Sequence, residues 1–456
     1  MDDRPDLLEL ADRGIAAIRK EAPDLGAELY LYRGRDRGVE LREGRLESIQ
    51  ESEETGMGLR LFNGRGMGFA FSGGLDGAML SALCRRASEQ LARLPADPHR
   101  VLPEPNKGPG SEAEARALER TVNDPTLMTV PPRELVPRLE EMHARATRAD
   151  KRIAKVLQVG LGENASEVAI ISTAGVRAVE RGTSCSVGLY AMASAGQEVQ
   201  VGSASRSARF MRDLDLDGVV DEAVFRTVSL LDARRLPSKR RAVLFDPWVA
   251  GEIVGLLAGP MSAETVQRGK SLLRGKIGKR IASAGVSFVD DPLRPGGIAS
   301  AYSDDEGVPA RRKTMVENGV LRDYFYDTYT AHKDGLVSNG CAGRAGFKGL
   351  PGATSSNFYM EPGTMSRDEL VADTRDGILV FELMGMHTAD PISGEISVGV
   401  SGVALRNGEI SHGIRGAMLS GNLLDMLESV DAVADDLIFY GSLASPTFRV
   451  ADLTIA

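Results

Sequence analysis

The segment Asp246-Pro-Trp-Val-Ala-Gly251-Glu252-Ile-Val-Gly255-Leu256-Leu-Ala-Gly259-Pro260 decides how this chain is interpreted, and it directly follows the apolar stretch Arg241-Ala-Val-Leu-Phe245. Aspartate is a preferred N-cap, and proline is favoured at the first helical position. The order Asp246-Pro247 therefore predicts a strand followed at once by a helix. Glu252 lies in the middle of this otherwise apolar helix.

The neighbours of Glu252 do not suit a metal ion. In a zinc peptidase helix, histidines lie about one turn from such a glutamate, so that metal and general base act on the same water molecule. Here the corresponding positions hold Gly251 and Leu256, and neither side chain can bind a metal. The sequence therefore favours a structural or solvent-facing role for Glu252. The alternatives are a residual general base, or a carboxylate that binds a peptide amine or a partner's cation.

The second half of the chain resembles the TldD/TldE (PmbA) family of peptidases. Beyond the strand and helix around Glu252, four further segments are similar to family segments and follow the family's order: Asp304-Asp-Glu-Gly-Val-Pro309, Glu317-Asn-Gly-Val-Leu321, Phe381-Glu-Leu-Met-Gly385 and Ser420-Gly-Asn-Leu-Leu-Asp-Met426. The first half fits the family's pattern of strands and helices but contains no distinctive motif of its own.

The resemblance also implies which positions matter for a metal. In TldD-type subunits this helix carries His-Glu-x-x-x-His, and a distant cysteine supplies a third ligand. Those ligand positions fall on Gly251 and Leu256 and near Tyr440, and only the glutamate, Glu252, is matched. The chain is therefore similar to the TldE (PmbA) type. That type implies no cofactor in this chain and zinc in a partner subunit.

The function implied by this resemblance is that of a silent subunit. A TldE-type chain is expected to be inactive alone and to pair with a TldD-type subunit as a heterodimeric zinc metallopeptidase. The complex is expected to act on unfolded or modified peptides, in leader removal or proteolysis. A peptide held extended against a sheet edge would bind through main-chain hydrogen bonds.

Two alternatives remain open. One is a metal-free homodimer that binds peptides or acts as a scaffold, since closed twofold pairs are the commonest assemblies. The other is a hydrolase with relocated chemistry, for which Cys341 with His332 would be the candidate pair. The five histidines are scattered, which argues against a zinc site built from closely spaced ligands.

Three residues in the family-like segments are candidates for the peptide or cleft. Glu306 follows Asp304-Asp305 at a predicted turn, and it either lines a cleft or supports the turn. Gly421 and Asn422 precede an amphipathic run, and they either bond a peptide or hold the turn. The sequence does not favour one role over the other in either case.

The pattern of elements predicts an α+β fold in three parts. Residues 1–110 form a helix and antiparallel-sheet domain, residues 111–235 a central helix and mostly β segment, and residues 236–456 a glycine-rich mixed α/β domain. In the first part, strands are predicted over Ala27–Tyr32, Gly38–Arg42 and Gly56–Phe62. Asn63-Gly64 then predicts a hairpin turn into a strand over Met67–Phe71.

Composition limits the binding partners and the cellular compartment that are expected for this chain. The net charge is -9, and like charges do not cluster, which argues against nucleic acid or anionic membranes as partners. Three widely separated cysteines favour a reducing compartment. The acidic N-terminus does not resemble a signal peptide, and no apolar run reaches the length of a membrane span. These features predict a cytoplasmic protein.

Overall fold

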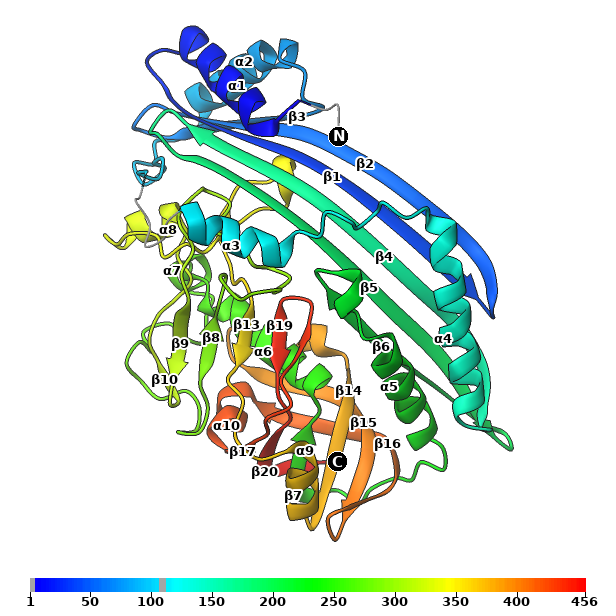
Figure 1. Cartoon of the computed structure of the whole chain (residues 1–456). Coiled ribbons are helices and arrows are strands. Elements are labelled where there is room, and N and C mark those ends of the chain that lie inside the picture. Colours follow the sequence, from blue (N-terminus) through cyan, green and yellow to red (C-terminus); the bar gives the residue numbers. More distant parts are fainter. Residues whose placement is uncertain (1–4, 106–111) are drawn as a thin grey trace.

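The computed structural model describes residues 5–105 and 112–456, and it has the predicted α+β fold. Long strands from the first half of the chain form a curved sheet, and the C-terminal elements gather on its concave side (Figure 1). No helix in these ranges is both long and apolar enough to cross a membrane.

The curved sheet is six-stranded and antiparallel, in the order β3-β2-β1-β4-β5-β6. Its strands are β1 (Gly26–Arg42), β2 (Arg45–Phe62), β3 (Met67–Gly73), β4 (Ile153–Ser172), β5 (Arg177–Ala195) and β6 (Glu198–Ala208). Because β1 pairs with β4 from Glu28↔Ser172 to Arg42↔Gln158, one sheet runs through the first two predicted parts of the chain.

The predicted hairpin at Asn63-Gly64 is confirmed, since Phe62 of β2 pairs with Met67 of β3. The strands predicted before this turn are too short. The predicted strands over Ala27–Tyr32 and Gly38–Arg42 are parts of one continuous strand, β1, and the strand predicted from Gly56 is the end of β2, which begins at Arg45. Most of the early residues of β2 are exposed, so they lack the apolar alternation from which a strand is predicted.

Helices cover one face of this sheet. Leu29 and Val39 of β1 point to that face. Leu29 contributes to a core with α1 (Leu7–Glu21) and α2 (Ala78–Arg93), and Val39 to a core with α4 (Val136–Ala149) and α5 (Leu216–Ser229). The remaining helix of this half, α3 (Glu112–Val122), contacts β5. The opposite face carries Glu28, Tyr30 and Gly38.

The C-terminal part is built around β7 (Lys239–Phe245) and α6 (Pro247–Met261), as the opening segment predicts. The Asp246 carboxylate accepts a hydrogen bond from the Trp248 amide at 3.0 Å and so caps α6. Val249, Ile253 and Leu257 on α6 are fully buried in the C-terminal core. The helix is therefore held by packing on its apolar face.

Two further six-stranded sheets surround α6. One has the order β16-β15-β14-β7-β20-β17, and it closes on itself because Leu419 of β16 also pairs with Ile455 of β20. Its other strands are β14 (Asp376–Met384), β15 (Glu395–Arg406), β16 (Glu409–Asn422), β17 (Val430–Val433) and β20 (Phe448–Ile455).

The other sheet has the order β10-β9-β8-β13-β19-β18. Its strands are β8 (Phe288–Asp290), β9 (Lys313–Glu317), β10 (Val320–Leu321), β13 (Phe358–Met360), β18 (Ile438–Tyr440) and β19 (Leu443–Ser445). The remaining elements are α7 (Ala263–Gln267), α8 (Thr328–Lys333), α9 (Arg367–Asp373), α10 (Leu423–Glu428), and the small pair β11 (Ala342–Gly343) and β12 (Gly352–Ala353).

A buried ionic network joins the curved sheet to the C-terminal part. Arg60 of β2 forms ion pairs with Glu28 of β1 and with Glu306, at 2.9 Å for the latter. Arg344 from a C-terminal loop also pairs with Glu28. All four side chains are at most 4% exposed, so the partners are held in fixed geometry at the junction.

Candidate functional site

The candidate site is a cavity of about 550 Å³ between the curved sheet and α6. Strands β5 and β6 form one wall, and α5, α6 and β14 form the other. Its lining combines small and aromatic residues with charged ones: Gly188, Tyr190, Val201, Gly202, Ser203, Ala204, Ser205, Arg226, Leu230, Trp248, Glu252, Phe381, Glu382 and Leu383. Glu252, the residue singled out by the sequence, therefore faces an open space large enough for a ligand.

Glu252 is partly buried, and its Oε2 atom is buried without a hydrogen-bond partner among the described residues. Burial and the neighbouring Glu382 carboxylate raise the pKa of Glu252 to about 7, while Arg226 opposes this effect. A carboxyl group with such a pKa exchanges its proton near neutral pH and is a strong acceptor when ionised. An unpaired buried carboxylate also costs free energy that a ligand could recover.

The arginine beside the cavity is already neutralised by other carboxylates. Arg226 lies 2.5 Å from Glu222, one turn earlier on α5, and 3.0 Å from Asp246. Glu222 also pairs with Arg206 of β6. The Nε atom of Arg226 is nevertheless buried without a partner in the described structure. The cavity thus offers one unpaired donor and one unpaired acceptor.

Tyr440, at the position implied for a third metal ligand, is part of the cavity's surroundings. Its hydroxyl donates to the Glu222 carboxylate at 3.1 Å, and its ring meets the Trp248 ring edge-on at 4.8 Å between centroids. Burial raises the pKa of Tyr440, so the phenol stays protonated at neutral pH. Its hydroxyl is therefore committed to holding α5 beside α6.

The other two implied ligand positions lie on α6. Gly251 is buried, and a Cβ atom there would lie 3.9 Å from the Ala444 Cα of β19, which is an ordinary contact. Glycine is therefore not required at this position by crowding. Leu256 is partly buried and packs against the C-terminal core.

The residues present do not fit the zinc of the TldD-type helix. Gly251 and Leu256 have no donor atoms, and the Tyr440 hydroxyl is bonded to Glu222. Across residues 5–105 and 112–456, no group of three or more His, Cys, Asp or Glu side chains is arranged to hold a metal ion. The cavity has two carboxylates, Glu252 and Glu382, and stable zinc sites use three or four protein ligands.

The remaining sequence candidates lie outside this cavity. Glu306 is 1% exposed; its Oε1 accepts from Arg60 at 2.9 Å and its Oε2 from the Thr328 amide at 2.8 Å. Both of its oxygens are thus used inside the protein, in the junction network. Asn422 caps α10 by accepting from the Leu424 amide at 3.0 Å, and it donates to the Ser393 carbonyl at 2.8 Å. These contacts give Asn422 a turn-holding role.

Gly421 precedes Asn422 at the end of β16, where it pairs with Ile396 and is exposed. A Cβ atom at Gly421 would meet no heavy atom within 4 Å. The backbone there has no need for a glycine on grounds of space.

The proposed pair of Cys341 and His332 does not have the features of a nucleophile and its base. Cys341 is 4% exposed, and burial raises the pKa of its thiol to about 12, although Lys313 lowers it. Reactive cysteines have a lowered pKa and some exposure. The His332 ring instead lies against His99, with 3.2 Å between the two Nδ1 atoms.

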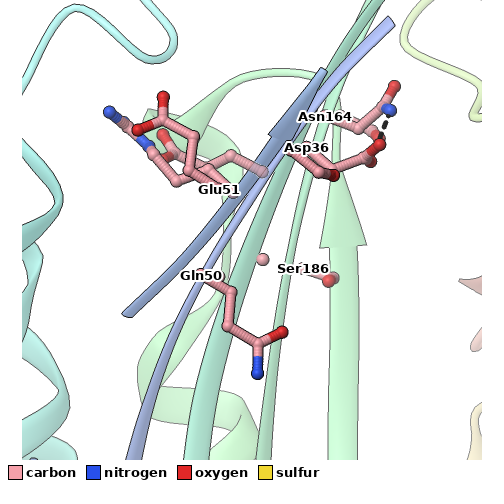
Figure 2. A pocket seen from close by; sticks show the side chains of 11 residues that line it. Asp36, Gln50, Glu51, Asn164 and Ser186 are labelled. Carbon is pink, nitrogen blue, oxygen red and sulfur yellow. Dashed lines mark hydrogen bonds and ion pairs between the residues drawn. The ribbon is translucent and has the colours of Figure 1, made fainter. Parts of the chain in front are cut away.

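A second cavity, of about 430 Å³, lies on the curved sheet where glycines leave the backbone bare. Gly38 of β1 pairs with Gly162 of β4, which in turn pairs with Ser186 of β5. Figure 2 shows Asp36 and Asn164 beside each other at this hollow, and a 2.8 Å hydrogen bond joins them. Ser186, which lines this hollow, is followed at every second residue of β5 by Gly188 and Tyr190, which line the Glu252 cavity. Every second residue of a strand faces the same side, so both cavities open on one face of the sheet.

Several residues of the site were missed by the sequence interpretation. Glu222 and Arg226 are four residues apart on a helix, which is the spacing of an ion pair, but nothing local indicates that they meet Asp246 and Tyr440. Glu382 lies within a family-like segment, yet its position opposite Glu252 depends on the parallel pairing of β14 with β7.

Comparisons with known proteins cover nearly the whole chain. Three models match: PmbA/TldA metallopeptidase domain 1 over residues 27–91, the central domain over 126–231, and the C-terminal domain over 238–456. A metalloprotease of Methanothermobacter thermautotrophicus is 27% identical over 423 residues, covering 90% of this chain and 88% of that protein. Metalloprotease PmbA of Escherichia coli O157:H7 is 26% identical over 435 residues, covering 93% and 92%.

Solved structures have the same architecture. A Thermotoga maritima protein, described as a candidate modulator of a DNA gyrase, matches with a TM-score of 0.88 at 25% identity, covering 99% of this chain and 100% of that one. TldE from Thermococcus kodakarensis matches with a TM-score of 0.87 at 22% identity, covering 98% and 100%, which shows a shared fold.

Proposed function

Because the chain belongs to the PmbA/TldD metallopeptidase family, we propose that it is a TldE-type subunit that is catalytically silent alone. It pairs with a TldD-type subunit that supplies the zinc, and together they cleave unfolded or modified peptides. A zinc ion held by the partner would supply Lewis-acid chemistry, polarising the scissile carbonyl and activating water. This chain contributes a wall of the peptide chamber.

The observation that carries this proposal is the donor set around Glu252. The family scaffold is complete here, including the strand, the helix and its glutamate. The positions for metal ligands hold Gly251, Leu256 and Tyr440, and Tyr440 is engaged with Glu222. A glutamate base without a metal beside it has no activated water to deprotonate.

The surface beside the cavity supports a role with peptides. β6 is the last strand of the curved sheet, and residues 201–205 of this strand line the cavity. A peptide in an extended conformation can pair with such an edge through main-chain hydrogen bonds, with little dependence on sequence. The small residues Gly188, Ser203 and Ser205 leave room for a backbone to approach.

The experiment is to measure zinc content and peptidase activity for this chain alone, for a TldD-type subunit alone, and for their mixture. We expect zinc in the partner and cleavage only in the mixture. A Glu252→Gln variant should still form the complex and retain its zinc, because the metal is held by the other chain. Stoichiometric zinc and cleavage by this chain alone would refute the proposal.

The second candidate is the metal-free homodimer that binds peptides. Molar mass in solution separates the two, since a homodimer predicts a stable twofold particle that does not exchange with a TldD-type subunit. We also propose a cytoplasmic location, which is supported by three cysteines that are all free and buried.

A further inference from the structure

We propose that the cavity beside Glu252 binds the amino-terminal residue of a peptide. Glu252 and Glu382 receive the α-ammonium group, and Arg226 donates from Nε to the carbonyl oxygen of the same residue. This inference rests on the proposal that the chain handles peptides, and it names the part of the peptide that this chain holds. It concerns the chain by itself and requires no partner subunit.

The first argument is that the cavity leaves a matched pair of polar atoms unsatisfied. Glu252 Oε2 and Arg226 Nε are both buried without a hydrogen-bond partner in the described structure. Arg226 is only 6% exposed, and both residues line the same cavity. Buried polar groups are nearly always paired, so these two atoms indicate a ligand with a donor and an acceptor. An amino-terminal residue carries both, an ammonium donor and a carbonyl acceptor that are separated only by Cα and the carbonyl carbon.

The second argument is the charge around the cavity. The guanidinium groups of Arg206 and Arg226 are paired with Glu222 and Asp246, and Arg367 adds a weaker contact to Asp246 at 3.8 Å. Within the described ranges, Glu252 and Glu382 form no ion pair, and the cation that acts on Glu252, Arg226, is already paired with Glu222 and Asp246. The cavity therefore has an excess of negative charge, which a ligand cation would neutralise.

The third argument is the aromatic lining. Tyr190, Trp248 and Phe381 line the same cavity as the partly buried Glu252 and the exposed Glu382. Aromatic faces attract organic cations. This environment suits an ammonium group with an attached side chain. It does not suit a transition metal, because the cavity provides no nitrogen or sulfur ligand.

The test is calorimetric titration of the full-length chain with three probes at neutral pH. Trialanine amide has a free amino terminus, acetyl-trialanine amide has a blocked one, and acetyl-lysine methylamide has only a side-chain ammonium. We expect trialanine amide to bind, and each of the other two to bind more weakly by about ten-fold or more. Equal binding of the blocked peptide would overturn the proposal. Equal binding of the lysine probe would overturn the assignment to an amino terminus.

A matched pair of variants locates the binding. Glu252→Gln keeps the shape and removes the charge, and it should weaken trialanine amide by about ten-fold or more. Glu428→Gln changes an exposed glutamate at the end of α10 and should have no effect. An unchanged affinity of the Glu252 variant for trialanine amide would overturn the proposal. If that variant folds poorly, the comparison of the three probes on the wild-type chain still tests it.

The two experiments separate the two proposals. An active, zinc-containing mixture together with no binding of trialanine amide to this chain refutes only the amino-terminal site. Specific binding of trialanine amide with an inactive mixture refutes only the subunit proposal.

Discussion

Replacing Glu252 by glutamine should make the C-terminal part more stable at alkaline pH and leave it unchanged in acid. The pKa of Glu252 is raised from 4.5 to about 7, mainly by burial. The folded state therefore holds its proton more tightly than the unfolded state does. Below the unfolded pKa, Glu252 is protonated in both states, and the stability that its neutral form contributes is fully present. As pH rises through the folded pKa, near 7, this contribution to the free energy of unfolding is lost.

The size of this effect follows from the shift. The pKa of Glu252 is about 2.5 higher in the folded state than in the unfolded state, which corresponds to about 3.4 kcal/mol at about 1.36 kcal/mol for each pKa unit. Glu252 is only partly buried, so solvent screening reduces the net cost to about 1.5–2 kcal/mol. Glutamine avoids this cost because it carries no charge at any pH. For a domain of this size, the gain corresponds to roughly 3–8 °C in melting temperature.

The assay is thermal unfolding of the wild type, Glu252→Gln and Glu428→Gln at pH 4.5 and pH 8.5. The Glu252 variant should melt with the wild type at the lower pH and above it at the higher pH. The Glu428 variant should follow the wild type at both, since its glutamate is exposed. A Glu252 variant that melts below the wild type at pH 8.5 would show that its charge is compensated inside the protein.

Three further predictions concern other parts of the molecule. Glu306→Ala leaves two buried donors unpaired and should destabilise the protein by about 3–5 kcal/mol, measured as a fall in the urea midpoint; a change below about 1 kcal/mol would mean that water replaces the carboxylate. Cys341 should resist iodoacetamide at pH 8 in the native protein and react after unfolding, as followed by mass spectrometry, because its pKa is raised to about 12; rapid native labelling would contradict its burial. Gly402→Ala places a Cβ atom 2.1 Å from the Leu379 carbonyl oxygen and should destabilise the protein by about 3 kcal/mol or more. Gly421→Ala places its Cβ atom where no heavy atom lies within 4 Å, and it should leave the stability nearly unchanged in the same unfolding assay.

Local signals in the sequence predicted local structure well. Asp246 and Pro247 determine the start of α6 through contacts with adjacent residues, so the helix could be predicted without knowledge of the fold. The same holds for the turn at Asn63-Gly64. Strand length in β2 could not be predicted, because its polar residues near Arg45 gain their conformation from pairing with β1.

The candidate site depended on contacts between distant residues. Glu252 was identified from its place in an apolar helix, but its neighbours Glu382 and Arg226 come from other elements. Glu306 could be assigned to a cleft only by its segment, whereas its partner Arg60 lies 246 positions away. No periodicity in the sequence encodes that pairing, so its junction role emerges only from the assembled structure.

The way Glu28 is shared has a consequence for dividing the chain. Glu28 is bound at once by Arg60 from its own sheet and by Arg344 from the C-terminal part. Cutting the chain near residue 236 would leave Arg344 and Glu306 without their ionic partners, on a surface that is buried in the intact chain. The isolated C-terminal fragment would therefore expose apolar side chains and unpaired charges on that surface. It should be recovered in soluble form only when the first half of the chain is supplied as a separate polypeptide.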